Sequence, residues 1–249
     1  MTNGELMGRV RELRQRGRTP KEIARALGLP PSVVAPLVRE IAATQPSTQA
    51  ALVGCWVNET WAGGLAVSGH HDWPGVGIAA DAGNSGMASV LVARDGGGNV
   101  TVCGYLVDVW CLGVKNAVGP KSVERRKLPR FVGDYYRSFD QPPVPAPLEL
   151  VRNIVFGAVE YARKLGFEPH PDFPKCVSHL GRWDGRSDIT FGRDGKPMYI
   201  EGPYDDATRI MQTLRKSVGA DGFHYISQVA GQMLDRAESP STSSSASAV

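Results

Sequence analysis

The chain has 249 residues, which is enough for one large domain or for a small domain beside a medium one. Hydrophobic residues make up 42% and charged residues 21%, so we expect a packed core and no global disorder. The formal net charge of +3 is mildly basic, and by itself it argues only weakly for a nucleic-acid partner.

The positive charge is concentrated at the N-terminus. Residues 1–45 contain four glutamates and eight cationic side chains, namely Arg9, Arg11, Arg14, Arg16, Arg18, Lys21, Arg25 and Arg39. This segment therefore carries +4, and the rest of the chain sums to about −1. We expect an anionic partner to be attracted mainly to the N-terminal segment.

The cysteines indicate a reducing compartment. Cys55, Cys103, Cys111 and Cys176 form no C-x-x-C pair, and their spacing is that of neither a disulfide framework nor a zinc finger. The sequence begins with no apolar stretch of signal-peptide type and has no run of membrane-spanning length. We therefore expect a soluble, cytoplasmic protein that has no membrane partner.

Three short helices are expected at the start of the chain. Leu6, Val10 and Leu13 recur at i, i+4 and i+7, which is the spacing of one helical face. Pro20 suits the first position of a second helix, which Gly28 should end. A third helix is expected over residues 32–41, followed by the polar linker "AATQPSTQA", so a first domain should span residues 1–45.

Residues 46–238 have a mixed pattern. A Gly-rich loop at 62–86 precedes two apolar segments, "ASVLVAR" and "NVTVCGYLV", which are joined by "DGGG" and therefore predict a β-hairpin. The second segment is apolar on both faces, so this strand should be central and covered on both sides. A second hairpin is expected in "DITFGRDGKPMYIEGP", with Asp194-Gly195 at its turn.

Helices should pack against these hairpins. One is expected to start at Asp108, another to run from Leu148 to Leu165, and a third to follow a cap at Asp205 or Asp206. The stretch "FHYI" suits a last strand, and residues 239–249 have the composition of a disordered tail. The expected fold class is therefore an α/β or α+β main domain of β-hairpins with packed helices, preceded by a small all-α domain.

The first domain resembles bacterial helix-turn-helix domains over residues 5–42. The resemblance is carried by Ala24 where two helices cross, Gly28 in the turn, and Val34 and Leu37 locking the third helix onto the second. It implies a recognition helix that docks in the major groove of double-stranded DNA. An ordinary three-helix bundle with no role in nucleic-acid binding explains the same spacing and stays open.

The expected recognition helix has few groups that can contact bases. Between Pro31 and Pro36 only Ser32 can bond to a base edge, and Arg39 lies too far along the helix. Pro36 lacks a backbone donor and should shorten or kink the helix. The cationic side chains around the second helix are instead expected to contact phosphates; these are Arg14, Arg16, Arg18, Lys21 and Arg25. The sequence predicts DNA binding with weak base preference.

One segment of the larger domain could carry chemistry. If a helix begins at Asp108, then Asp108, Cys111 and Lys115 share one face, and a cysteine beside a lysine could become a nucleophile. The alternative is that Asp108 caps the helix, Cys111 is a small buried residue and Lys115 reaches the surface. No histidine lies nearby in the sequence to act as a base.

Metal binding is the other chemical candidate. Cys176 and His179 have the gap of a zinc-ligand pair, and "GHHDWPG" supplies His70 and His71, but neither group offers four ligands. Exposed loop histidines explain the same residues. Asp205 and Asp206 could hold Mg²⁺, although capping a helix is the simpler use. We therefore expect neither a metal nor a cofactor.

The stretch "KSVERRKLPRFVGDYYRSF" mixes six cations with aromatic rings, the combination that holds single-stranded nucleic acid. A solvated helix whose rings face the core explains it equally. The segments "VDVWCLGVKNA" and "FGRDGKPMYIEGPYDD" resemble uncharacterised actinobacterial proteins linked to a helix-turn-helix, which implies no established activity.

These patterns favour a DNA-binding transcriptional regulator. Residues 46–238 would then sense a small-molecule ligand or form a homodimer interface. Two alternatives remain: an enzyme that uses Cys111 or a metal and is tethered to nucleic acid, and a protein-interaction adaptor with the helix-turn-helix shape.

Overall fold

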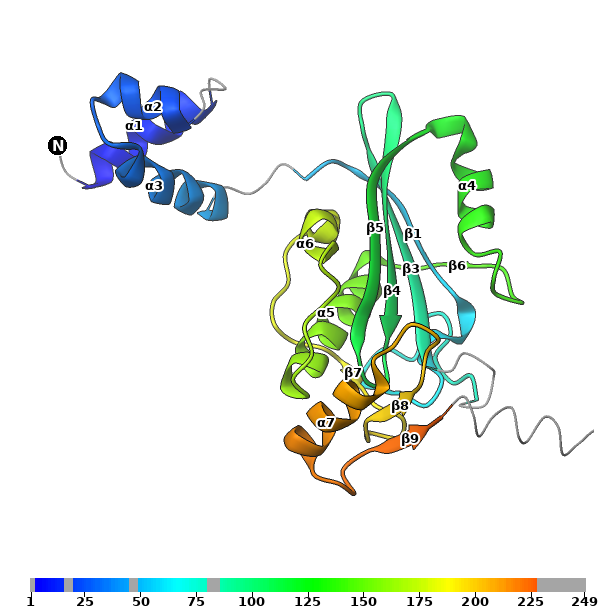
Figure 1. Cartoon of the computed structure of the whole chain (residues 1–249). Coiled ribbons are helices and arrows are strands. Elements are labelled where there is room, and N and C mark those ends of the chain that lie inside the picture. The colour runs from blue at the N-terminus through cyan, green and yellow to red at the C-terminus, as the bar shows by residue number, and fades with distance from the viewer. Residues whose placement is uncertain (1–2, 16–19, 45–48, 80–85, 228–249) are drawn as a thin grey trace, which may run out of the picture. The chain divides into compact units, whose positions relative to one another are not determined.

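The structure is a computed structural model that describes residues 3–15, 20–44, 49–79 and 86–227. The chain divides into two compact units, Met1–Gln49 and Ala50–Val249 (Figure 1). The second unit is a mixed α/β structure built on a five-stranded antiparallel sheet, and the first contains helices alone among its described residues. None of the helices in the described ranges has the length and apolar character needed to cross a membrane.

Unit 1 packs its helices around a small apolar core. The elements are α1 (Asn3–Gln15), α2 (Pro20–Leu27) and α3 (Pro31–Thr44). The five residues buried between them are Val10, Ile23, Ala24, Val34 and Val38. The partly buried side chains of Leu6, Leu13 and Leu37 pack against this core, so the helical stripe expected in the first helix is confirmed.

Pro36 does not end α3, which continues to Thr44. Of the two expected effects of this proline, shortening of the helix was wrong, and a kink stays a prediction. A proline removes one hydrogen bond of the helix, but Val34 and Val38 on either side of it are buried in the core of unit 1. Their packing outweighs the local preference of the proline, because most helix stability in proteins comes from burying an apolar face.

Unit 2 is organised by a sheet with the strand order β5-β4-β3-β1-β6. Its members are β1 (Leu52–Val57), β3 (Met87–Asp95), β4 (Asn99–Asp108), β5 (Gly113–Glu124) and β6 (Val144–Pro145). The hairpin expected at "DGGG" is confirmed, since β3 pairs with β4 in register from Met87↔Asp108 to Asp95↔Val100. Every neighbouring pair in this sheet is antiparallel.

Helices cover both faces of the sheet, as expected for a strand that is apolar on both sides. Cys103, Tyr105 and Val107 of β4 pack on the side of α5 (Leu148–Lys164) and α6 (Phe173–Cys176). Val100 and Val102 pack on the side of α4 (Leu128–Tyr135). Figure 1 shows α5 and α4 on opposite sides of the strands. The central position expected for this strand is confirmed.

No helix starts at Asp108, where one was expected. Asp108 is the last residue of β4, and β5 begins after a tight turn at Gly113, its partner in the register. One carboxylate oxygen of Asp108 accepts hydrogen bonds from the backbone N–H groups of Trp110 (3.0 Å) and Cys111 (2.9 Å). Such capping occurs at turns as well as at helix starts, so the aspartate alone did not distinguish them.

The second expected hairpin forms only at its turn. Asp194 and Gly195 have φ of 54° and 79°, and Arg193 pairs with Lys196 across the turn. The strands on either side pair elsewhere, so the hairpin prediction was otherwise wrong. These strands and their partners are β7 (Ile189–Thr190) with β2 (Ala66–Val67), and β8 (Met198–Ile200) with β9 (His224–Ile226).

The remaining expectations for unit 2 are mostly confirmed. Helix α5 covers the predicted span, and Asp206 caps α7 (Ala207–Val218) by accepting a hydrogen bond from the N–H of Arg209 at 3.0 Å. The described residues of unit 2 also contain three short 3₁₀ turns: η1 (Glu59–Ala62), η2 (Arg125–Lys127) and η3 (Val177–His179). The predicted tail at 239–249 and part of the Gly-rich loop, 80–85, lie outside the described residues.

Candidate functional site

Helices α2 and α3 are joined by a short turn that contains Gly28. The φ of Gly28 is 64°, in the left-handed region that glycine favours, and the N–H of Leu29 donates to the carbonyl of Ala24 at 3.0 Å to close α2. Ala24 and Val34 are buried in the core of unit 1. The sequence therefore bends sharply at the glycine and buries the two predicted contact positions.

The first turns of α3 present an exposed face to solvent. Ser32, Val33 and Pro36 are all exposed, and Val33 has 42% of its surface accessible. Ser32 is the one hydrogen-bonding side chain between Pro31 and Pro36. The face that would meet a DNA groove is thus accessible but mainly apolar, as the sequence predicted.

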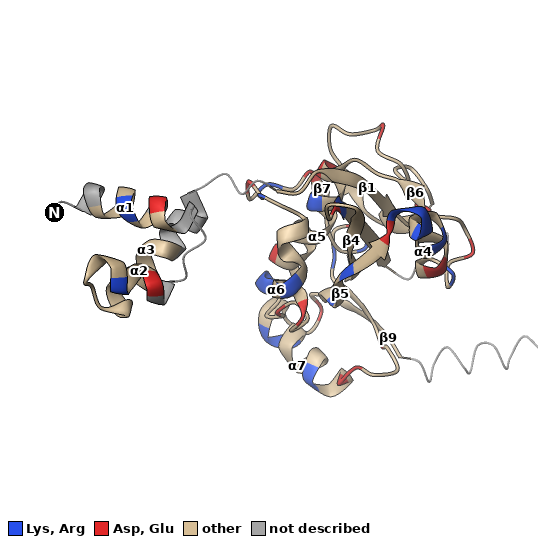
Figure 2. Ribbon diagram, turned by 90° about the horizontal axis from the view of Figure 1, so that it is seen from above, with Lys and Arg blue, Asp and Glu red and all other residues tan. Residues whose placement is uncertain are grey.

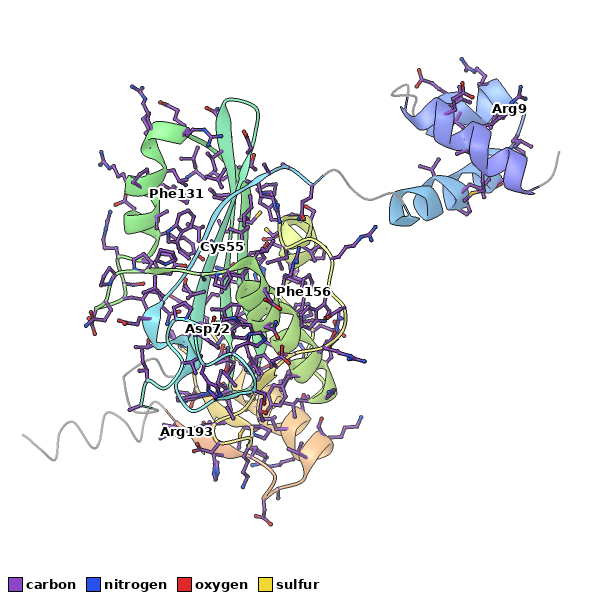
Figure 3. All side chains as sticks on the ribbon, turned by 180° about the vertical axis from the view of Figure 1, so that it is seen from behind. Arg9, Cys55, Asp72, Phe131, Phe156 and Arg193 are labelled. Carbon is purple, nitrogen blue, oxygen red and sulfur yellow. The ribbon has the colours of Figure 1, made fainter. Side chains whose placement is uncertain are left out.

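The structure describes only part of the set of arginine and lysine side chains predicted to bind DNA. Arg25, on α2, is exposed. Arg14, Lys21 and Arg39 lie within α1, α2 and α3, but their side chains are outside the described residues, as are Arg16 and Arg18 altogether. Arg9 on α1 is also exposed (Figure 3). Sequence analysis did not include Arg9 among the DNA contacts, although Arg9 lies outside the apolar stripe of Leu6, Val10 and Leu13.

The predicted nucleophile Cys111 is wholly buried. Burial raises the pKa of its thiol far above the usual range, and the negative charge of Asp108 raises it further, while Lys115 only lowers it in part. A thiol in this state is not a nucleophile at neutral pH. The helical face that would have combined Asp108, Cys111 and Lys115 does not form, so that interpretation was wrong.

Lys115 is engaged elsewhere. Its Nζ lies 2.9 Å from both carboxylate oxygens of Asp205, a residue 90 positions away in the chain. Asp205 also accepts hydrogen bonds from the N–H of Gly202 at 2.9 Å and the hydroxyl of Tyr199 at 3.4 Å. This network joins β5 to the segment before α7. Because Asp205 is committed to Lys115 and Asp206 caps α7, the two carboxylates do not form a magnesium site.

Cys176 and His179 do not form a zinc site. The thiol of Cys176 donates to the carbonyl of Gly119 at 3.3 Å, and Nε2 of His179 lies 3.3 Å from the carbonyl of Thr101. Within the described residues there is no cluster of three or more His, Cys, Asp or Glu side chains that could hold a metal. His70 stacks on Trp73 instead, with ring centroids 4.0 Å apart.

The rings of the basic, aromatic stretch are mostly unavailable for stacking on bases. Tyr136 is 2% exposed, and its hydroxyl donates to the carbonyl of Trp56 at 2.7 Å. Tyr135 is partly buried in the same layer, and the Nζ of Lys121 lies 5.2 Å from the centroid of the Phe131 ring. The cations of this stretch, of which only Arg130 belongs to α4, are exposed, and Glu124 and Asp134 lie among them in the sequence (Figure 2). This geometry agrees with the alternative given above, a solvated helix whose rings face the core, rather than with a surface that binds single-stranded nucleic acid.

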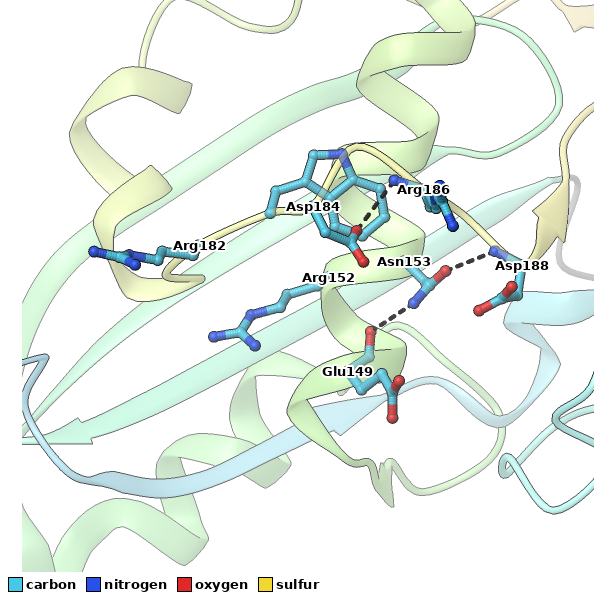
Figure 4. A pocket seen from close by; sticks show the side chains of 8 residues that line it. Glu149, Arg152, Asn153, Arg182, Asp184, Arg186 and Asp188 are labelled. Carbon is cyan, nitrogen blue, oxygen red and sulfur yellow. Dashed lines mark hydrogen bonds between the residues drawn. The ribbon is translucent and has the colours of Figure 1, made fainter. Parts of the chain in front are cut away.

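A cavity of about 740 Å³ opens beside the start of α5 (Figure 4). It is lined by Glu149, Arg152, Asn153, Arg182, Trp183, Asp184, Arg186 and Asp188. Its volume is in the range typical of small-molecule sites, although its lining is more charged than most. Sequence analysis missed this cavity because its lining comes from two separate segments, and the density of arginine in "GRWDGR" was the only signal.

Comparisons with protein-family models, with curated proteins and with solved structures gave no match for this chain.

Proposed function

We propose that this protein binds double-stranded DNA through α2 and α3 and regulates transcription from a cytoplasmic location. The observation that supports this best is the packing of Ala24 against the core shared with Val34, which leaves the start of α3 exposed around Ser32. A helix-turn-helix domain needs this combination, because its third helix must be held firmly and still reach the groove.

Contacts to phosphates should dominate the interaction. The exposed residues at the start of α3 offer one hydroxyl and no cation, so direct base recognition is limited to Ser32. Arg25 and Arg9 are exposed cations of the same unit, and the segment 1–45 carries +4. An interaction of this kind is strong at low salt and has weak sequence preference.

The salt dependence of binding tests this proposal. Fluorescence anisotropy with random duplexes should give a log–log slope that falls by about one unit for each lost phosphate contact. We expect the slope to fall by about one unit for Arg25→Ala and by about two units for the double variant Arg16→Ala/Arg18→Ala. Arg163→Ala, which changes an exposed arginine of α5, is the matched control and should leave the slope unchanged. If all variants keep the slope of the original protein, DNA binding through unit 1 is refuted.

Unit 2 would sense a small molecule or form a homodimer in this proposal. The cavity beside α5 supports the sensing role by its size. A dimer would strengthen binding, since two weakly binding heads on one duplex act together. Measuring duplex binding against protein concentration tests the dimer, because a dimer that forms over the measured range makes the binding curve steeper.

A protein-interaction adaptor is the second candidate. The exposed apolar residues Val33 and Pro36 on α3 favour it, because apolar side chains on a recognition helix suit a protein partner better than a phosphate backbone. A gel shift with random duplexes at low and high salt separates the candidates. An adaptor would shift no duplex at either salt concentration.

A further inference from the structure

Arg94 of β3 is a buried cation that lacks a full set of partners. The residue is 5% exposed. Its Nε donates to the carbonyl of His179 at 2.7 Å and its Nη1 to the carbonyl of Ala50 at 2.8 Å, but its buried Nη2 has no hydrogen-bond partner. A buried polar atom without a partner is rare in proteins and often marks a missing ion, water or ligand.

Arg152 of α5 brings a second guanidinium to the same place. Its Nε donates to the carbonyl of Leu180 at 2.7 Å, so consecutive carbonyls, those of His179 and Leu180, hold the two arginines. Their positive charges interact, because Arg152 lowers the pKa of Arg94 in addition to the larger effect of burial. The fold therefore holds two like charges close together.

No anion of the described protein neutralises this pair. Neither Arg94 nor Arg152 lies within ion-pair distance of a carboxylate among the described residues. Cys55 is close enough to interact with both, but burial raises the pKa of its thiol to about 12, so it stays neutral. A buried charge is normally paired, since removing a charge from water is unfavourable. An anion that reaches Arg152 would therefore meet positive charge that no described carboxylate offsets.

The cavity beside α5 gives an anion access to Arg152. Figure 4 shows the side chains of Arg152 and Arg182 extending toward the same side, away from Glu149 and Asp188. Asp188 is already engaged, since its carboxylate lies 3.3 Å from Nε2 of His70. Arg152 and Arg182 thus bring two positive charges to one end of a cavity whose lining also includes Asp184 and Arg186.

The loop that carries Arg182 is held against α5 by the neighbouring Trp183. The ring of Trp183 stacks on Phe156 of α5 with centroids 5.5 Å apart, and its Nε1 donates to Glu160 at 2.6 Å. Arg152 is held by Leu180 of the same connection. Side chains fixed before binding lose less conformational entropy when a ligand arrives, which favours binding.

We propose that this cavity binds a small molecule through an oxyanion group, a phosphate or a carboxylate, held by Arg152 and Arg182. Arg94 is not part of the lining, and it adds positive charge behind Arg152. The guanidinium fork suits both oxyanions, because each presents two oxygens to parallel N–H donors. This site does not depend on DNA binding by unit 1, and it would supply the ligand that a sensing role requires.

Thermal unfolding of the full chain with inorganic phosphate tests the proposal, with chloride adjusted to keep ionic strength constant. Phosphate should raise the melting temperature saturably, because a ligand that binds only the folded state stabilises it. Arg152→Ala should weaken the apparent phosphate affinity by about tenfold or more, the usual result of removing a charge-assisted pair. A parallel titration with acetate shows whether the site prefers a carboxylate, because the anion that it prefers should raise the melting temperature at the lower concentration.

Two matched variants complete the design. Arg163→Ala removes an arginine from the same helix, where it pairs with Glu168 on the surface, and should keep the phosphate response. Arg25→Ala weakens the proposed DNA surface and should also keep it, so failure of the DNA proposal leaves this result intact. Circular dichroism checks that Arg152→Ala is folded. The proposal is overturned if neither anion stabilises the original protein, or if Arg152→Ala responds as strongly.

Discussion

The two units place their chemistry-bearing side chains in opposite environments. In unit 1 the described candidates, Arg25 and Ser32, are exposed. In unit 2 four of the predicted catalytic and metal-binding residues are buried and engaged in packing or hydrogen bonds; these are Asp108, Cys111, Cys176 and His179. The candidate side chains described in unit 1 are therefore accessible to a partner, whereas those named in unit 2 have structural roles.

The contrast follows from the size of the two cores. Unit 1 buries five side chains among the described residues, so most of its helical surface faces water. Unit 2 covers its sheet on both faces, and cysteine, aspartate and tyrosine side chains on the strands are enclosed. A ligand can reach a side chain in such a core only through a cavity. Arg152 and Arg182 line a cavity, whereas Cys111 is not among the residues that line it.

The largest expected change in stability comes from replacing one buried isoleucine by alanine in the core of each unit. Ile154→Ala in α5 should lower the free energy of unfolding of unit 2 by about 3 kcal/mol, through lost burial and a cavity. Ile23→Ala makes the same change in unit 1. All five tryptophans lie after residue 50, so tryptophan fluorescence reports unit 2 alone.

Urea titrations followed by that fluorescence should show a shifted midpoint for Ile154→Ala and none for Ile23→Ala. The second variant should instead lose helical circular dichroism and duplex binding, because a small core tolerates little loss. Equal fluorescence shifts would mean that the two units unfold as one.

Asp108 should make unit 2 less stable as pH rises from about 4 to about 6. Burial raises the pKa of this carboxyl from 3.8 to about 6, so the folded state keeps a proton that the unfolded state releases. That stabilisation is present at the acid end and is lost through the folded pKa, an effect on the order of 3 kcal/mol.

Asp108→Asn keeps an oxygen acceptor for Trp110 and Cys111 but carries no charge. It should match the original protein near pH 4 and exceed its stability at pH 7. The measurement is the difference between the two urea midpoints across pH. A difference that does not change with pH would contradict the assignment.

Breaking the ion pair between β5 and the segment before α7 should have a smaller effect. Asp205→Ala leaves Lys115, whose side chain is 25% exposed, without its carboxylate, and leaves the N–H of Gly202 unpaired. We expect a loss of about 2 kcal/mol. The neighbouring Asp206→Ala removes only the cap of α7 and should cost about 1 kcal/mol. The reverse order in urea titration would show that the pair contributes little.

The smallest expected signal is the chemical modification of the cysteines in the folded protein. Cys55, Cys103, Cys111 and Cys176 are all buried, and burial raises the pKa of each thiol. Iodoacetamide at neutral pH should therefore modify none of them in the folded protein and all of them in urea, as read by mass spectrometry. Rapid native labelling of Cys111 would restore the enzyme alternative.

Sequence analysis succeeded where structure is local. The helices of unit 1, α5 and α7 follow from apolar spacing, caps and terminal glycines, since these depend on residues only a few positions apart. The β3–β4 hairpin follows from alternation and a glycine turn for the same reason. The exposed, mainly apolar start of α3 was also readable from Pro31 to Pro36.

Tertiary structure decided everything that joins distant segments. The turn after Asp108 and the separate partners of β7 and β8 depend on which strand lies alongside, and a short apolar run does not encode its partner. The same is true of Lys115 with Asp205, and of Arg94 with Arg152. Local spacing determines which face of an element is apolar, but the charges that meet across the fold are set by packing of elements far apart in the chain.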